Sequence, residues 1–220
     1  MPVSNFDGET FVAFMDISGF KELMKKDNRA WEALNSFYSL GYMVLGDRTT
    51  NIVSSKVEGI FVSDCGILFV NSNGTAIEKL NLLLKKVMEI NKGMLSRDFM
   101  LTTSIAYGHF KYQNRIEFEG IEKNAVYGGA YLDAYADAEI GNPHIQPGQC
   151  RIVKNKLPQE VVTEIETARD GIFEKIEKER EHYYFYWNVS RKTEIEDFKS
   201  NYRDSYRLKY QGMLKALKGN

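Results

Sequence analysis

The sequence predicts a fold of the α+β class, and three features carry this prediction. Short, continuously apolar runs at 11–15 and 65–70 are typical of strands that are covered on both faces. The segment 76–95 repeats apolar residues at helical spacing and predicts a long amphipathic helix. The order of predicted elements is β-α-α-β-β-α-β followed by a helix. This order fits a ferredoxin-like core (βαββαβ type) with an antiparallel-rich sheet and an extra helix.

Each element follows from a local pattern. The strand at 11–15 runs into a turn and a helix, for which Ser18 is a suitable N-cap and Glu22 supports the first turn. Apolar residues spaced three or four apart predict a second helix between 31 and 45. We further expect extended segments at 52–53 and 57–62, strands at 65–70 and 99–107, the helix at 76–95, and a Gly-Gly followed by a helix within 125–140.

The chain changes character after residue 142, where Pro143, Pro147 and Gly148 interrupt the pattern. We therefore predict a core at 1–142 and a C-terminal extension at 143–220 that packs on the same domain. The extension is expected to contain a short strand at 150–153, a charged helix opened by Pro158, a strand at 182–189 and a basic helix at 195–217.

Aromatic residues gather at 183–187 within this extension. They are either a stacking platform for bases or part of a buried strand that seals the edge of the sheet. Because strands favour aromatic residues, the buried strand is the better interpretation.

Composition limits the function classes. The chain has 220 residues and a net charge of −1, which gives no positive field for nucleic acid or an anionic membrane surface. The N-terminus has no signal pattern, and no apolar run is long enough to cross a bilayer. Cys65 and Cys150 have no metal-type spacing and are expected to be reduced. We expect a cytoplasmic protein without nucleic-acid or membrane partners.

Two carboxylates stand at the edges of apolar strands. Asp16 follows the run at 11–15, and Asp64 lies between the segments 57–62 and 65–70, where only a tight hairpin fits. Taken singly, Asp16 is a helix cap and Asp64 an ordinary turn residue. Taken together, they predict a pair aimed at one point, which suits divalent cations in phosphoryl transfer.

Four segments together resemble the class III nucleotidyl cyclases. FMDISGF at 14–20 resembles their first-strand motif, and VSDC at 62–65 resembles the hairpin with their second metal aspartate, with Ser63 in place of the usual Gly. Residues 101–108 resemble the strand that ends in Gly, and 127–139 their last Gly-to-helix segment. The resemblance covers roughly residues 10–140.

This resemblance implies a homodimer with active sites at the subunit interface. It implies two divalent ions per site, Mn²⁺ or Mg²⁺, held by Asp16, Ile17 and Asp64, with Asp16 and Asp64 as the catalytic residues. The ribose 3′-hydroxyl of a nucleoside triphosphate would attack the α-phosphate and expel pyrophosphate. The nucleotide would be bound by Phe14, Ser18, Gly19, Phe20, Ile60 and Ser63, with backbone N–H groups of the turn after Asp16 near the triphosphate.

The sequence departs from purine cyclases at two places. Their base-selecting Lys or Glu stands four residues before the second metal aspartate, where this chain has Ile60. Their last helix carries an Asn and an Arg four residues apart, whereas the two registers here give Leu132 with Ala136, or Asp133 with Asp137. The transition-state cation would need another source. Candidates are Lys111, Arg115, Lys21 and Arg97.

These departures resemble the pyrimidine cyclases of the bacterial Pycsar antiphage systems. That resemblance implies a UTP or CTP cyclase that makes cyclic UMP or cyclic CMP, favours manganese, and signals to a separate effector. Alternatives are a purine cyclase in which Glu58 or Lys56 reaches the base, and an inactive cyclase-like nucleotide-binding module. A nucleic-acid-binding protein on the same core is disfavoured by the near-neutral charge. His109 is better explained as an exposed or hydrogen-bonded structural residue than as a general base.

Overall fold

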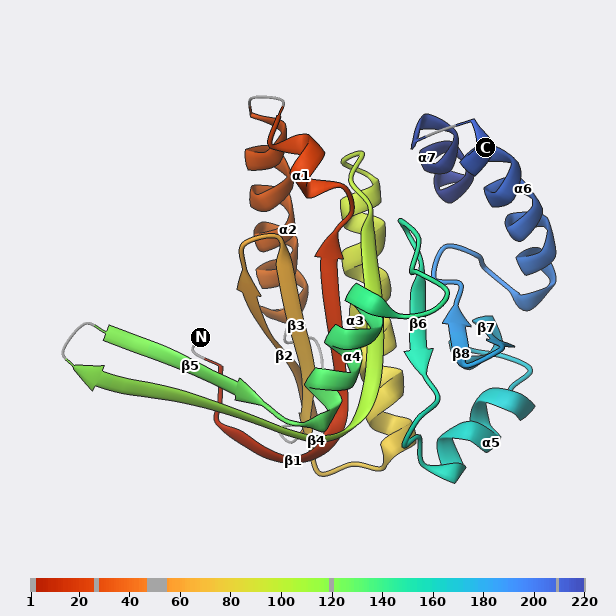
Figure 1. Ribbon diagram of the computed structural model, residues 1–220. Helices are drawn as coiled ribbons and strands as arrows, with labels where there is room; N and C mark the ends of the chain where they lie inside the picture. Colours follow the sequence, from red (N-terminus) through yellow and green to blue (C-terminus); the bar gives the residue numbers. More distant parts are fainter. Residues whose placement is uncertain (1–2, 26–27, 47–54, 119–120, 209, 220) are drawn as a thin grey trace.

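A mostly antiparallel, eight-stranded sheet organises the protein (Figure 1). The computed structural model describes residues 3–25, 28–46, 55–118, 121–208 and 210–219. The strand order is β2-β3-β1-β4-β6-β8-β7, and β5 pairs with β4 outside this path. The strands are β1 (Phe6–Ile17), β2 (Ser55–Val62), β3 (Cys65–Ser72), β4 (Leu101–Phe118), β5 (Ile121–Tyr127), β6 (Cys150–Val153), β7 (Ile176–Glu179) and β8 (His182–Phe185).

Helices cover the two faces of the sheet unequally. Residues of α2 and α3 belong to the large core, whereas α4 packs on the opposite face against β1 and β4. Figure 1 shows α4 in front of the sheet and α2 and α3 behind it. The α-helices are α1 (Phe20–Leu23), α2 (Arg29–Gly46), α3 (Ala76–Leu95), α4 (Gly129–Ile140), α5 (Gln159–Thr167), α6 (Ile195–Arg207) and α7 (Tyr210–Lys218).

Strand β1 explains why the sheet has two different faces. Its side chains alternate, so Ala13 and Met15 enter the large core beneath α2 and α3. Phe14 points to the other face and packs with Ala106 and Ala134. Because alternation continues along the strand, Asp16 shares a face with Phe14. The side chain of Asp16 therefore lies on the α4 side of the sheet.

Helix α3 confirms the predicted long helix in its bounds, 76–95. A capping box fixes its start: the Thr75 hydroxyl accepts from the backbone N–H of Glu78, and the Glu78 carboxylate accepts from the N–H of Thr75. The predicted order of core elements is confirmed as far as β4, after which an additional strand precedes the helix α4. The segment at 52–53 lies outside the described residues.

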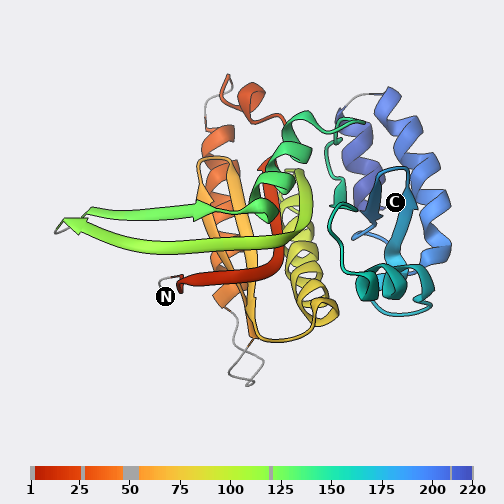
Figure 2. The same cartoon turned by 60° about the horizontal axis from the view of Figure 1, so that its bottom comes forward.

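Strand β4 is longer than the sequence predicts, and β5 was not predicted. The expected strand at 99–107 is found at Leu101–Phe118, and β5 (Ile121–Tyr127) pairs with its second half. Figure 2 shows this pair as an arm that extends away from the rest of the molecule. The arm was missed although residues 111–118 alternate polar residues with Tyr112, Ile116 and Phe118, a pattern that is typical of a strand.

The turn between β1 and α1 corrects one prediction. Ser18 does not cap the helix, because the N-cap is Gly19, with a left-handed φ of 72°, and no side chain caps α1. The backbone N–H of Ser18 donates instead to the Met100 carbonyl at 2.9 Å. The buried Ser18 Oγ meets no hydrogen-bond partner among the described residues. The tight approach of β1 to the start of β4 overrides the local capping signal.

The C-terminal extension continues the sheet. The predicted strand at 150–153 is β6, which runs parallel to β4, and the strand at 182–189 is confirmed only as β8, 182–185. Strand β7 was not predicted. Tyr183, Phe185 and Trp187 are each 2% exposed. The stacking platform for bases is therefore wrong, and the buried strand is correct.

The basic C-terminal helix is two helices rather than one. α6 ends at Arg207 and α7 begins at Tyr210. The two pack together closely, because a Cβ built at Gly212 would lie 2.6 Å from the Ser205 carbonyl oxygen. This packing lets Met213 and Leu217 of α7 reach the large core, which a straight helix would not allow. Among the described residues, no helix combines the length and apolar character needed to cross a membrane.

Candidate metal and nucleotide site

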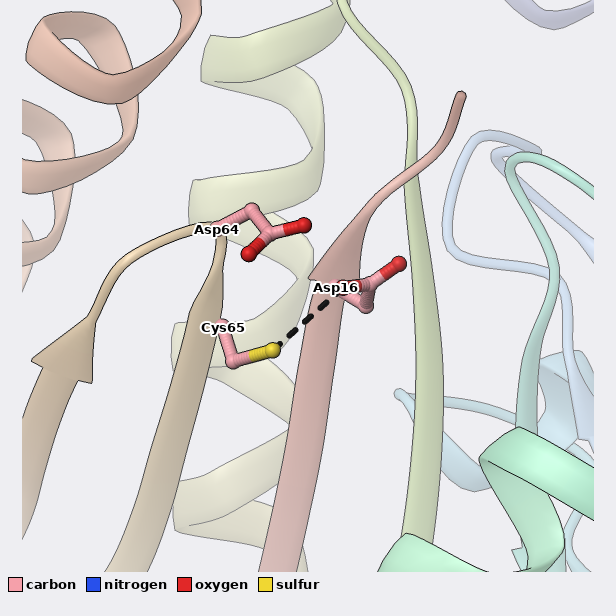
Figure 3. A group of neighbouring side chains, drawn as sticks. All are labelled: Asp16, Asp64 and Cys65. Carbon is pink, nitrogen blue, oxygen red and sulfur yellow. Dashed lines mark hydrogen bonds between the residues drawn. The ribbon is translucent and has the colours of Figure 1, made fainter. Parts of the chain in front are cut away.

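The sheet brings the two predicted carboxylates together. β2 and β3 are joined by a hairpin in which Val62 pairs with Cys65, leaving Ser63 and Asp64 as the turn. Strand β3 pairs with β1 so that Cys65 lies opposite Asp16, and the Ile17 N–H donates to the Asp64 carbonyl at 3.1 Å. One carboxylate oxygen from Asp16 and one from Asp64 lie within 4.8 Å of each other (Figure 3). The predicted convergence is confirmed, and its metal role stays a prediction.

Cys65 is a third member of this cluster, and sequence reasoning missed it. Its Sγ lies within 4.8 Å of both carboxylate oxygens and donates to Asp16 Oδ1 at 3.4 Å. The thiol is partly exposed, whereas Cys150 is buried elsewhere in the sheet. The signal was available: a two-residue hairpin places the residue after Asp64 at the first pairing position of β3. We use the name acid cluster for Asp16, Asp64 and Cys65.

The acid cluster has the electrostatics of a cation site. Burial raises the pKa of Asp16 to about 6, and the negative charges of Asp64 and Glu139 act in the same direction. The thiol hydrogen bond and the charge of Lys21 lower it without cancelling the rise. Burial and the neighbouring carboxylates also raise the pKa of the Cys65 thiol above its usual range. A bound cation would relieve this excess of negative charge.

The donors fit a divalent ion such as Mg²⁺ or Mn²⁺. Two carboxylates at a partly buried strand edge are oxygen ligands of the kind these ions prefer. The third predicted ligand, Ile17, has a side chain that is 1% exposed and belongs to the large core. Only its main-chain oxygen is therefore available to a metal.

An apolar floor adjoins the acid cluster. Asp16 of β1 pairs with Cys65 of β3. Two residues farther along the strands, Ile60 of β2 pairs with Ile67 of β3, and Ile67 pairs with Phe14 of β1. These side chains share the sheet face of Asp16, about 7 Å from its row. Tyr135 of α4 contacts Phe14 edge-on, with 5.3 Å between ring centroids. The predicted nucleotide-binding residues Phe14 and Ile60 thus lie beside the cluster.

Glu58 and Lys56, the alternative purine-reading residues, are engaged elsewhere. Glu58 is 6% exposed, and its carboxylate accepts from the Ser4 N–H at 2.5 Å and from Asn71 Nδ2 at 2.9 Å. Lys56 pairs with Glu58 at 2.9 Å. Glu58 also lies one row beyond Ile60, farther from the acid cluster. Neither side chain is placed to read a base that lies on the apolar floor.

The remaining predicted nucleotide contacts fall into two groups. Ser18 and Phe20 are 5% and 7% exposed, and the Phe20 ring belongs to the large core, so their side chains face inward. Gly19 and Ser63 are exposed, and both have positive φ values, 72° and 53°. The turn after Asp16 and the hairpin turn therefore offer backbone rather than side chains to a ligand.

The four cation candidates lie at different places. Lys111 pairs with Asp7 at 2.7 Å, and Asp7 precedes Asp16 by nine residues on β1, which is about 30 Å along a strand. Arg115 lies farther along the arm and donates to Gln113. Arg97 donates to the Gly93 carbonyl at 2.9 Å. Lys21 is near enough to Asp16 to lower its pKa.

Helix α4 supplies no cation in either predicted register. Leu132 is 61% exposed, and Asp133 pairs with Lys156 at 2.7 Å. Asp137 is 9% exposed and belongs to a buried network with Arg151 and His182. None of these side chains carries a positive charge that could neutralise a phosphate.

His109 lies far from the acid cluster. Its Nε2 lies 2.8 Å from Asp7 Oδ1, and the side chain is 46% exposed. The prediction of an exposed, hydrogen-bonded histidine is confirmed.

Solved structures of nucleotidyl cyclases share this fold. The adenylyl cyclase CyaB from P. aeruginosa matches with a TM-score of 0.56 and 17% identity, over 83% of this chain and 95% of that one. The catalytic core of a rhodopsin-guanylyl cyclase with converted specificity, in complex with ATPαS, matches with a TM-score of 0.53 and 10% identity, over 83% and 97%. A bacterial light-regulated adenylyl cyclase matches with a TM-score of 0.51 and 16% identity, over 69% of this chain and 44% of that one.

No protein-family model matches the chain, and no curated protein matches it in sequence. At identities this low, structural similarity establishes the fold and not the activity. The α+β architecture with its antiparallel-rich sheet is the one predicted from the sequence. The chain has the class III cyclase core fold.

Proposed function

We propose that this chain is a metal-dependent nucleotidyl cyclase, which converts a nucleoside triphosphate to a 3′,5′-cyclic monophosphate and pyrophosphate. The observation that carries the proposal is the convergence of Asp16 and Asp64 at the strand edge. Two of the solved structures that share this fold are named as an adenylyl cyclase and a rhodopsin-guanylyl cyclase. Fold and acid cluster thus support one activity from independent directions.

Asp16 and Asp64 would hold two divalent ions, Mn²⁺ or Mg²⁺, with the main-chain oxygen of Ile17. When bound, the ions would supply acidification of the ribose 3′-hydroxyl and neutralisation of the leaving pyrophosphate. The bond between O3′ and the α-phosphorus forms, the bond from that phosphorus to the bridging oxygen breaks, and the hydroxyl proton passes to solvent. The backbone at Gly19 and Ser63 borders the same edge of the sheet and would flank the phosphates.

We propose a pyrimidine nucleotide, UTP or CTP, as the substrate. The floor beside the acid cluster is made by Ile60, Ile67 and Phe14, which offer shape and no hydrogen bonds. A site that reads a purine edge needs a placed donor or acceptor, and Glu58 and Lys56 are paired with each other. A small base on an apolar floor suits this arrangement better.

The active form is proposed to be a homodimer with both sites at the interface. Val62 of β2 is on the same sheet face as Asp16 and is 62% exposed, and α4 exposes Leu132 and Ile140 at 61% and 82%. Apolar side chains exposed around a site mark an interaction surface. Lys111 and Arg115 lie too far along β4 to serve the acid cluster of their own chain, and they would have to reach the partner's nucleotide to act as its transition-state cation.

The resemblance to Pycsar cyclases extends this proposal to biology. The product, cyclic UMP or cyclic CMP, would act as a second messenger in antiphage defence and would activate a separate effector in the cytoplasm. An inactive nucleotide-binding module remains the competing candidate, because α4 carries no cation where purine cyclases place an Arg.

The test is incubation of the purified chain with ATP, GTP, UTP and CTP, each with Mn²⁺ and with Mg²⁺, followed by mass identification of products. Formation of cyclic UMP or cyclic CMP supports the proposal. Faster formation of cyclic AMP or cyclic GMP would replace the pyrimidine assignment with a purine one. Nucleotide binding without any cyclic product would identify the inactive module.

A further inference from the structure

A cavity lies in the C-terminal extension, and its walls include no residue of the acid cluster. Its volume is about 590 Å³, within the range of roughly 300–1,000 Å³ found for small-molecule sites. The loop 143–149, strand β8 with the residues after it, and helix α6 form its walls. In Figures 1 and 2, α6 stands at the far end of the molecule from the β4–β5 arm.

Helix α6 presents two parallel rows to this cavity. An aromatic–basic dipeptide recurs every four residues along the helix, and residues four apart lie on one helix face. The rows therefore run side by side, about 6 Å per step. All six residues line the cavity: the aromatic row is Phe198, Tyr202 and Tyr206, and the basic row is Lys199, Arg203 and Arg207.

The aromatic row is a fixed stacking surface. The rings of Tyr202 and Tyr206 have centroids 6.3 Å apart and planes inclined by only 24°. The Tyr202 hydroxyl donates to the Pro147 carbonyl at 2.9 Å, which holds this ring against the opposite wall. Tyr206 is 49% exposed, so its ring is open to a ligand.

The basic row has a neutralised end and a free end. Lys199 pairs with Glu177 at 2.5 Å, Glu179 at 3.1 Å and Glu196 at 3.2 Å. Within the described part of the chain, Arg203 and Arg207 form neither an ion pair nor a side-chain hydrogen bond. Two unpaired guanidinium groups one helical turn apart suit a single phosphate, which they can bind through several N–H donors.

We propose that this cavity binds a mononucleotide, with the phosphate on Arg203 and Arg207 and the base stacked on Tyr202 and Tyr206. Aromatic rings beside arginines recognise a flat ring that carries an anionic group. Single-stranded nucleic acid fits less well, because the glutamates around Lys199 would face the next phosphate along the row. The site is independent of the proposed catalysis.

The test is calorimetric titration of the purified full-length chain with UMP and with AMP, in EDTA. At least one is expected to bind, with uridine and ribose 5-phosphate each weaker by about tenfold or more, since each lacks one recognised group. Inorganic phosphate that binds as tightly as the nucleotide would overturn the role of the base. A thymidine octamer that binds more tightly than either nucleotide would overturn the choice of ligand, as would absence of binding at millimolar concentration.

Variants locate the site. The double variant Arg203→Gln/Arg207→Gln is expected to weaken binding about a hundredfold, since two charge-assisted contacts are lost. Arg169→Gln/Arg191→Gln removes the same charge from exposed arginines outside the cavity and should leave affinity unchanged. Asp64→Asn should also leave it unchanged. Loss of binding in Asp64→Asn but not in the Arg203/Arg207 variant would place the nucleotide at the acid cluster and refute the proposal. Tyr206→Ala, at an exposed position, repeats the test of the cavity without changing charge.

Discussion

Two aspartates on the same side of the sheet, Asp16 and Asp137, have opposite environments. Asp137 accepts from Ser104 Oγ at 2.5 Å and from Arg151 Nε at 2.7 Å, and His182 Nε2 lies 2.7 Å from its other oxygen. Asp16 has the Cys65 thiol and, nearby, a second carboxylate. Among the described residues, no lysine or arginine forms an ion pair with Asp16 or Asp64.

The pKa values follow this contrast. Burial alone would raise the pKa of Asp137, yet the hydrogen bonds from His182, Arg151 and Ser104 outweigh burial and hold it below the usual value of 3.8. Burial raises the pKa of Asp16 to about 6. A carboxylate whose oxygens accept hydrogen bonds from residues of the same chain stabilises the fold. A carboxylate that lies beside other carboxylates is expected to bind a cation. The sequence alone does not distinguish the two.

The largest effect is expected for Asp64→Asn, which tests whether the acid cluster is the site of catalysis. It is expected to lower cyclic nucleotide formation by about two to three orders of magnitude or more, because it removes a charged ligand of the metal ions that stabilise the transition state. The melting temperature should change little, since the residue lies in a turn, is only partly buried and forms no ion pair among the described residues. Product yield by mass spectrometry measures the loss of activity, electron paramagnetic resonance measures the accompanying loss of Mn²⁺ binding, and thermal unfolding measures the melting temperature.

Asp133→Asn is the matched control, because Asp133 is a carboxylate of α4 paired with Lys156 at the surface. It should retain activity and Mn²⁺ binding. Equal losses in both variants would show that the acid cluster has no special role.

Asp137→Asn tests the other side of the comparison. Arg151 is 0% exposed, so removing its partner leaves a buried charge uncompensated, which costs about 3–5 kcal/mol. We expect a lower midpoint in urea unfolding, with Mn²⁺ affinity unchanged in the fraction that is folded. An unchanged midpoint would contradict the structural role of the network.

The pH dependence of stability should have opposite signs for the two aspartates. In EDTA, ionised Asp16 destabilises the fold, because its folded pKa of about 6 lies above the unfolded value of 3.8. Asp16→Asn should therefore gain about 1–2 kcal/mol relative to the parent chain as pH rises from about 4 to 6, a figure reduced for solvent screening.

Asp137 should behave in the reverse way. Its folded pKa is depressed, so its contribution is present above the unfolded pKa of 3.8 and is lost as pH falls below that value. Urea midpoints measured for the parent chain and both Asn variants, from well below pH 3.8 up to about 6, decide the signs. Parallel curves for Asp16→Asn and the parent would refute the raised pKa.

The smallest expected effect concerns the apolar floor beside the acid cluster. Ile60→Ala should raise the ratio of ATP to UTP turnover by about tenfold, because a shortened side chain admits a larger base. Val57→Ala is the control, since Val57 is on the same strand but faces the large core. A competition assay with both nucleotides gives the ratio directly, and an unchanged ratio in Ile60→Ala would remove Ile60 from base selection.

Strong local signals made the core predictable. The apolar runs of β1 and β3, the periodicity of α3 and the turn at Ser63 and Asp64 specify the elements and bring the two carboxylates together. The extension of β4 into the arm could have been predicted as well, because residues 111–118 alternate polar residues with Tyr112, Ile116 and Phe118, interrupted only by Asn114. The break between α6 and α7 depends on the close packing of Gly212 against Ser205. The spacing of apolar residues along the sequence does not indicate this contact.

Side-chain roles that depend on distant partners were also hidden. Ser18 has the residue type of a helix cap, but its N–H bonds to Met100 at the far side of the sequence. The engagement of Glu58 with Ser4 and Asn71 likewise joins three separated segments. The aromatic and basic rows of α6 are visible in the sequence, whereas the loop that turns them into a cavity wall is not.

The shortness of the β2–β3 hairpin has a consequence for how this chain can vary. A single residue inserted between Val62 and Cys65 that shifted the pairing of β3 by one step would turn Cys65, Ile67 and Phe69 toward α2 and α3, and would turn Leu68 and Val70 to the opposite face. The strand pairing is therefore compatible with substitutions in this turn, but not with insertions or deletions that shift the register. Among chains that keep this pair of aspartates, the number of residues in the turn should vary less than the identity of the residue before the second aspartate.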